Sequence, residues 1–113
     1  PVMAIAHAIS GEVLDLLTPG THSTPDKTIA LFKAKDLEVM RLVLPAGKRV
    51  PDHDVQGSIT VQCLRGKVDL LLPDGTSTLQ AGQFAYVAGG VVYGLYAQQD
   101  SELLVTIAIP AAP

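Results

Sequence analysis

The sequence predicts an all-β fold in which short strands form a small barrel or sandwich, and three observations support this. Segments rich in Val, Leu, Ile and Thr, each about 4 to 9 residues long, recur along the chain. Gly, Pro and Asp separate these segments, and no long stretch has helical periodicity. A sheet with one apolar face must bury that face against another sheet or by closing on itself. Short strands without long helices therefore favour a double-sheeted barrel.

The expected strands follow from the apolar runs and from the turn residues between them. Pro73-Asp74-Gly75 suits a tight hairpin, because Pro fixes φ and Gly tolerates positive φ. Further breaks occur at Gly66 and around residues 45–47 and 89–90. The expected strands cover residues 28–34, 37–44, 59–65, 67–72, 76–80, 84–87, 91–97 and 102–109.

The region before these strands has a less definite pattern. Ser10 could cap a short helix in residues 10–17, but the run EVLDLL also suits a strand, so both remain open. Residues 18–27 are rich in Thr and Pro and are expected to form a polar loop. We therefore expect residues 1–27 to be a segment that packs on a barrel formed by residues 28–113.

Composition restricts the classes of function. The chain has 113 residues, 48% hydrophobic and 17% charged, which fits one globular domain. Its 8 Lys and Arg are scattered and are outnumbered by 11 Asp and Glu, so no nucleic-acid partner is expected. The apolar runs fall short of the roughly 20 residues of a membrane span, and the first residues lack the basic region of a secretion signal. The single cysteine, Cys63, excludes an internal disulfide and favours the cytoplasm.

The last expected strand is apolar on both of its faces, and this pattern bears on assembly. Residues 103–109 read LLVTIAI, whereas a strand with one face in water alternates polar and apolar residues. The second apolar face is expected to meet another copy of the chain, so a homodimer is predicted. The alternative is that the N-terminal segment of the same chain covers this face.

Residues 44–109 contain two spaced motifs. The first has the pattern Gly-x5-His-x-Val-x3-Ile-x6-Gly, from Gly47 through His53 to Gly66. The second has the pattern Gly-x5-Ala-x-Gly-x2-Tyr, from Gly82 to Tyr93. In this frame the sequence resembles the cupins, small jelly-roll barrels of the RmlC-like type. The resemblance implies a cupin-type double-stranded β-helix.

The resemblance also implies a metal site, and here the sequence departs from the family pattern. Cupins usually hold their metal with two His and a Glu of the first motif and a His of the second. This chain keeps His53, while Val55, Ile59 and Tyr93 stand at the other three positions. A divalent transition metal needs three or four N, O or S ligands. We therefore predict that the metal site is lost and that there is no cofactor.

An unconventional metal site remains an alternative. Asp54 would need a bulge to face the same way as His53, because neighbours on a strand point to opposite faces. Cys63 shares a face with Ile59 by alternation and could approach His53. A lone buried Cys is, however, commonly a small core residue.

The positions that hold the metal in cupins are expected to line an apolar pocket in this chain, which we call the cup. Two of its side chains, His53 and Tyr93, are polar. His53 and Tyr93 are expected to lie close enough for a hydrogen bond between imidazole and phenol. Arg49 could reach the barrel mouth and favour an anionic ligand. If the strand at residues 59–65 has the opposite orientation, Thr60 and Gln62 point inward instead and the cup is more polar. The candidate ligand-binding residues are His53, Tyr93, Val55, Ile59, Val61, Cys63, Gln62 and Arg49.

The predicted function is binding or sensing of a small molecule, of unidentified chemistry, in a barrel that has lost its metal site. No catalytic residue is predicted, because His53 has no evident carboxylate or nucleophile partner. One alternative is a metal-dependent oxygenase or isomerase with an unconventional site. Another is an interaction module with a filled barrel, in which His53 is a hydrogen-bonded structural residue.

Overall fold

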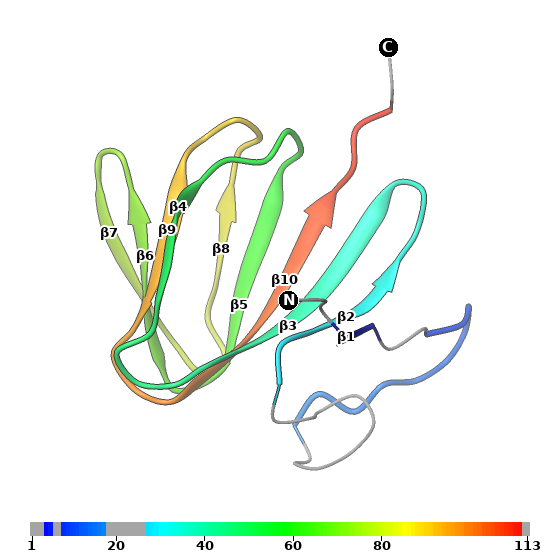
Figure 1. Cartoon of the computed structure of the whole chain (residues 1–113), viewed down its shortest axis with the longest axis horizontal. Helices are drawn as coiled ribbons and strands as arrows, with labels where there is room; N and C mark the ends of the chain where they lie inside the picture. The colour runs from blue at the N-terminus through cyan, green and yellow to red at the C-terminus, as the bar shows by residue number, and fades with distance from the viewer. Residues whose placement is uncertain (1–3, 6–7, 18–26, 112–113) are drawn as a thin grey trace.

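Two sheets face each other in the computed structural model of the chain, which describes residues 4–5, 8–17 and 27–111 (Figure 1). The strands are β1 Ala4–Ile5, β2 Ile29–Lys33, β3 Leu37–Leu44, β4 Arg49–His53, β5 Ile59–Arg65, β6 Lys67–Leu72, β7 Gly75–Gln80, β8 Phe84–Val87, β9 Tyr93–Ala97 and β10 Ser101–Ala108. The six-stranded sheet has the order β1-β2-β3-β10-β5-β8, and the four-stranded sheet has the order β4-β9-β6-β7. The predicted all-β, double-sheeted fold is therefore confirmed. No helix able to cross a membrane occurs among these residues.

The expected strands are all present. Strands β3, β5, β6 and β8 have the predicted bounds, and the others differ from the prediction by one or two residues at an end. The predicted hairpin joins β6 to β7, with Leu72 paired to Gly75 across the Pro73-Asp74 turn. All pairs except β1 with β2 are antiparallel. Strand β10 lies between β3 and β5, so the end of the chain holds the larger sheet together.

Two strands, β1 and β4, were not predicted. Strand β4 reads RVPDH, and four of its five residues are exposed, so it lacks the alternation that marks a half-buried strand. It lies at the edge of its sheet, where a proline such as Pro51 is tolerated because its missing N–H needs no partner. Residues 10–17, which the sequence left open, form turns and irregular backbone, and residues 18–26 of the predicted loop lie outside the described residues.

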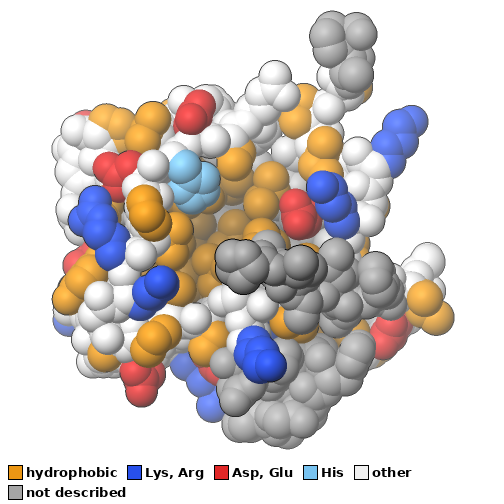
Figure 2. Space-filling view, viewed as in Figure 1, with side chains coloured by type: hydrophobic (Ala, Val, Ile, Leu, Met, Phe, Trp, Pro, Cys, Tyr) orange, Lys and Arg blue, Asp and Glu red, His pale blue; other side chains and the backbone are white. Residues whose placement is uncertain are grey.

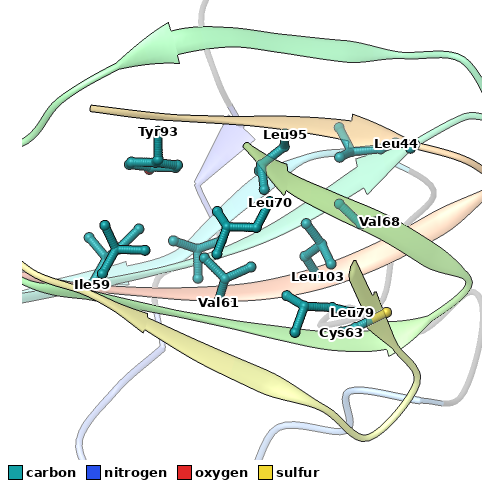
Figure 3. Packing of buried hydrophobic residues seen from close by; sticks show 13 residues of the cluster. Leu44, Ile59, Val61, Cys63, Val68, Leu70, Leu79, Tyr93, Leu95 and Leu103 are labelled. Atoms are coloured by element: carbon teal, nitrogen blue, oxygen red, sulfur yellow. The ribbon is translucent and has the colours of Figure 1, made fainter. Parts of the chain in front are cut away.

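The main core lies between the sheets and is built by alternate residues of each strand. On β5, Ile59, Val61 and Cys63 are buried while Gln62 is exposed, so the inward phase is the first of the two considered above. Figure 3 shows the buried side chains of both sheets pointing toward each other. The core residues are Leu44, Ile59, Val61, Cys63, Val68, Leu70, Leu79, Val87, Tyr93, Leu95, Ala97, Leu103 and Val105.

A second apolar cluster lies on the outer face of the six-stranded sheet. Ile29 and Leu31 of β2 are buried there, and Leu104 of β10 packs against them. Leu14 and Leu16 of the N-terminal segment pack on the same cluster. The second apolar face of β10 is thus covered in part by residues of the same chain, as the alternative reading of the sequence proposed.

Candidate functional site

A recess of about 180 Å³ lies between the two sheets, at the end of the barrel where β4 ends. Figure 2 shows a hollow with a hydrophobic floor and a histidine side chain at its rim. Seven of the nine lining residues are apolar, so the recess favours an apolar occupant over water. The lining residues are Met40, Leu42, Val50, His53, Val55, Tyr93, Leu95, Val105 and Ile107.

Strand alternation brings the walls of the recess together. Met40 and Leu42 are alternate residues of β3, and Val105 and Ile107 are alternate residues of β10. Met40 pairs directly with Val105 in the antiparallel register. One wall of the recess is therefore a continuous apolar surface on the six-stranded sheet.

His53 is positioned by the end of β4 and by its own backbone. It pairs with Tyr93 across the β4–β9 ladder. The two rings lie with their centroids 4.6 Å apart and their planes at 47°. The Nδ1 atom of His53 is 3.1 Å from the carbonyl oxygen of Pro51. The imidazole therefore has two fixed contacts, although the residue as a whole is exposed.

A register shift on β4 brings His53 to the recess. Val50 and His53 both line the recess, although residues three apart on a regular strand point to opposite faces. The pairing of β4 with β9 shifts between these two residues, which allows both side chains to face inward. Simple alternation along the sequence does not anticipate this arrangement.

Tyr93 places a hydroxyl in the recess. Its side chain is only 4% exposed, and Figure 3 shows it pointing from β9 into the space between the sheets. Burial raises the pKa of the phenol above its ordinary value of 10.0, so the hydroxyl stays protonated at neutral pH. Within the described residues the hydroxyl makes no hydrogen bond. The expected imidazole–phenol hydrogen bond is replaced by the ring contact with His53.

Arg49 is not among the residues that line the recess. It pairs with Tyr96, whose side chain faces away from the core. Its guanidinium is 3.2 Å from the carboxylate of Asp52, and both side chains are more than half exposed. This exposed ion pair partly neutralises the charge of Arg49 and contributes little to stability.

The remaining predicted site residues lie elsewhere. Ile59, Val61 and Cys63 are packed in the core, and Gln62 is on the outer face of the sheet, paired with Phe84. The Cys63 thiol is 3.3 Å from the carbonyl oxygen of Arg65, and burial raises its pKa above 9.0 despite that hydrogen bond. Of the predicted set, the structure brings His53, Tyr93 and Val55 together at the recess.

The candidate ligand-binding residues left out six of the lining residues, although alternation along residues 91–97 places Leu95 on the same face as Tyr93. Five of them lie in strands that were expected, and alternation along residues 37–44 and 102–109 could have identified those on the larger sheet. Val50 could not be found in this way, because β4 was not expected. The six residues are Met40, Leu42, Val50, Leu95, Val105 and Ile107.

The side chains around the recess do not fit a transition metal. Among the described residues that line the recess, His53 is the only one with a nitrogen ligand in its side chain, and Val55 has no donor atom. The phenol of Tyr93 is held in its protonated form by burial. No group of three or more His, Cys, Asp and Glu that could hold a metal occurs in the described part of the chain. These donors fall short of the three or four that such a metal needs.

Comparison with solved structures identifies the fold. No protein-family model and no curated protein matches the sequence. A Streptococcus pyogenes protein of unknown function is similar over 98% of each chain, at 21% identity and a TM-score of 0.74. A cupin superfamily protein of Desulfitobacterium hafniense is similar over 74% of this chain and 76% of its own, at 14% identity and a TM-score of 0.71.

A third similar structure strengthens the assignment of the fold. An RmlC-like cupin of Desulfovibrio desulfuricans is similar over 90% of this chain and 97% of its own, at 19% identity and a TM-score of 0.67. The structure of this chain is therefore a cupin-type jelly roll, as its two motifs predicted. Because this fold hosts many unrelated activities, function must be argued from the recess.

Proposed function

We propose that this chain is a small-molecule-binding or sensing protein whose binding site is the recess between the sheets. The observation that carries this proposal is the hydroxyl of Tyr93. It belongs to a side chain that is 4% exposed, lines the recess, and has no hydrogen-bond partner among the described residues. The hydroxyl oxygen is not among the fully buried polar atoms that lack a partner, so it is accessible from the recess, where a polar group of a ligand can bond to it.

The size of the recess favours binding over a sealed interaction module. The recess has a volume of about 180 Å³, whereas a barrel filled by its own side chains would leave no such space between the sheets. The walls are aliphatic except for His53 and Tyr93, so water filling the recess would lack hydrogen-bond partners. A compact apolar molecule would fit this volume and would need no hydrogen-bond partners from the walls.

Toluene is a suitable probe for this proposal, because it is compact and apolar. Added to the purified protein, it should shift the methyl NMR signals of Leu42, Val105 and Ile107. The variant Val105→Phe fills the recess and should abolish the shifts of Leu42 and Ile107. Val92→Phe is the matched control, since Val92 is 42% exposed and does not line the recess. Failure of toluene to perturb the lining methyl groups would count against the proposal.

Metal analysis separates this proposal from a metal-dependent enzyme. We expect purified protein to contain far less than one Fe, Mn, Ni or Zn ion per chain, because the recess offers a single histidine as a strong ligand. One tightly held ion per chain that disappears in His53→Ala would favour an oxygenase or isomerase instead. Loss of the ion only in a Cys63 variant would place such a metal elsewhere and leave the recess proposal intact.

We also propose that the chain forms a homodimer through the outer face of the six-stranded sheet. Phe84 and Tyr86 on β8 are 67% and 65% exposed on this face. They are alternate residues of an edge strand, so their rings lie on the same side of the sheet. Large exposed aromatic side chains on an edge strand favour association with a partner.

A further inference from the structure

The dimensions of the recess limit the size of its ligand, if the proposed binding function holds. An apolar cavity of about 150 Å³ is known to accommodate benzene in other proteins. The recess in this chain has a volume of about 180 Å³. It therefore suits a single six-membered ring with one small substituent, and it is too small for a nucleotide or a disaccharide.

The tautomer of His53 decides which polar group can enter. The Nδ1 atom lies 3.1 Å from the carbonyl oxygen of Pro51, and a carbonyl oxygen can only accept a hydrogen bond. Nδ1 therefore carries the proton and donates it to Pro51. In the neutral ring the other nitrogen, Nε2, is then a hydrogen-bond acceptor. A ligand that binds His53 in this form must donate.

Tyr93 supplies the complementary group. Its hydroxyl remains protonated and has no partner within the described residues. A phenol hydroxyl in this state can donate a hydrogen bond to a ligand oxygen. The contact between the rings of His53 and Tyr93 places the acceptor nitrogen and the donor hydroxyl on neighbouring side chains.

We propose that the recess binds a neutral, compact apolar molecule that carries one hydroxyl group, of the phenol or cyclic alcohol class. A hydroxyl both donates and accepts, so the same group can donate to Nε2 of His53 and accept from the hydroxyl of Tyr93. The ring or hydrocarbon body of the ligand then fills the space between Met40, Leu42 and Ile107.

Other polar groups match this pair less well. A carboxylate only accepts, so it would leave Nε2 of His53 without a donor, and it would bring a charge into an apolar recess. Among the residues that the structure describes, no Lys, Arg, Asp or Glu lines the recess to compensate, and Arg49 is in its ion pair with Asp52. An ammonium group only donates and would leave the hydroxyl of Tyr93 without an acceptor.

Three probes of similar size test the proposal: phenol, toluene and benzoate. Each is titrated into the full chain while the methyl signals of Leu42, Val105 and Ile107 are followed. We expect phenol to bind more tightly than toluene and benzoate to bind most weakly. Each lost hydrogen bond should weaken phenol binding about fivefold, so His53→Phe and Tyr93→Phe should each have this effect. Cooperative urea unfolding of both variants shows that they are folded, and the ratio of phenol affinity to toluene affinity within each variant isolates the lost hydrogen bond.

The outcomes separate this inference from the proposed function. Tyr96→Phe is the matched control, because Tyr96 lies on the same strand as Tyr93 and faces outward, and it should not change phenol binding. If toluene or benzoate binds at least as tightly as phenol, the hydroxyl inference is wrong while binding in the recess stands. If none of the three probes shifts the lining methyl signals, the proposed function fails as well.

Discussion

Tyr93 stands where the cupin pattern has a metal-ligating histidine, and burial determines what its side chain can do. A phenol in this recess is kept protonated because its charged form would lose hydration. The side chain therefore remains a neutral hydrogen-bonding group across the physiological pH range. Under the proposed function, this neutral hydroxyl orients a polar group of the ligand where the cupin pattern has a metal ligand.

The raised pKa of Tyr93 predicts a loss of stability at alkaline pH. Since the folded-state pKa lies above the unfolded-state value, the stabilisation is complete below the unfolded-state pKa and is lost as pH rises through the folded-state pKa. Tyr93→Phe should remove this part of the pH dependence. Urea unfolding measured between neutral pH and about pH 11 gives the free energy of unfolding against pH and tests the prediction.

Val92→Ala provides the control for this measurement. Val92 carries no titrating group and is 42% exposed, so this change should leave the alkaline slope of the original chain. Burial also raises the pKa of Cys63, and this residue contributes the same slope to all of these variants. Equal alkaline slopes for Tyr93→Phe and the original chain would contradict the prediction.

Gly66, in the turn between β5 and β6, is predicted to be intolerant of a side chain. Its φ is +86°, and a Cβ at this position would overlap the hydroxyl of Ser101 and the carbonyl oxygen of Asp100. Gly47 has a similar φ of +84°, but nothing lies within 4 Å of a Cβ placed there. A side chain at Gly47 would strain only the backbone, whereas one at Gly66 would also overlap neighbouring atoms. Comparing the two positions therefore separates the two costs.

Alanine at the two positions should have different effects on stability. We expect Gly47→Ala to cost about 1 to 2 kcal/mol, from the left-handed backbone alone. Gly66→Ala should cost at least about 2 kcal/mol more, because the turn must also move away from Ser101. Denaturant unfolding of both variants measures the difference. Similar losses for the two variants would show that the turn relaxes freely.

At the scale of elements, apolar alternation and turn residues were sufficient for most strands. Strands β3 and β5 alternate apolar residues toward one core, and their bounds were predicted. The bounds of strand β4 were not predicted, because an edge strand with four of its five residues exposed has no alternation to detect. Strand β4 instead forms through its pairing with β9, which is distant in the sequence. His53, for example, pairs with Tyr93, 40 residues later in the chain.

The recess could be predicted only in part for the same reason. The spacing of the two motifs brought His53 and Tyr93 together, and the structure places their rings in contact. The depth at which β5 residues lie could not be read from the sequence, so Ile59, Val61 and Cys63 were expected at the ligand and are packed in the core. Depth depends on the tilt and separation of the sheets, which alternation does not encode.

The N-terminal segment is predicted to depend on Leu14 for its attachment to the sheet. Leu14 packs on the cluster of Ile29 and Leu31, so Leu14→Asp should detach the segment at a cost of about 1 to 2 kcal/mol. The amide of Ala8, which donates to the carbonyl of Leu31 at 3.2 Å, should then exchange with solvent faster. Hydrogen exchange measured residue by residue tests this prediction.

The neighbouring residue offers a matched control. Val13 is 93% exposed, so Val13→Asp should change stability by less than about 0.5 kcal/mol and leave the exchange of Ala8 unaltered. If the two variants behaved alike, the packing of Leu14 would not be what holds the segment. Retained slow exchange on β10 in both variants would show that the barrel itself is intact.

At the scale of the whole molecule, the outer face of the six-stranded sheet is divided into two halves. The N-terminal segment covers the half formed by β2 and part of β10, whereas Phe84 and Tyr86 on β8 remain exposed. Between the halves, Glu102 is bonded at 2.8 Å to both Arg41 and Arg65. Charges that are paired within one chain would not repel a second copy, so this face is compatible with self-association.

The homodimer proposal predicts that two aromatic residues hold the chains together. In a two-fold symmetric dimer the same patch is used twice, so removing Phe84 and Tyr86 affects both sides of the interface. We expect the original chain to be a dimer by light scattering at micromolar concentration and the double variant Phe84→Ser, Tyr86→Ser to be a monomer. Tyr96→Ser, which alters an exposed aromatic of the other sheet, should remain a dimer. A monomeric original chain would show instead that a different partner, or water alone, meets this face.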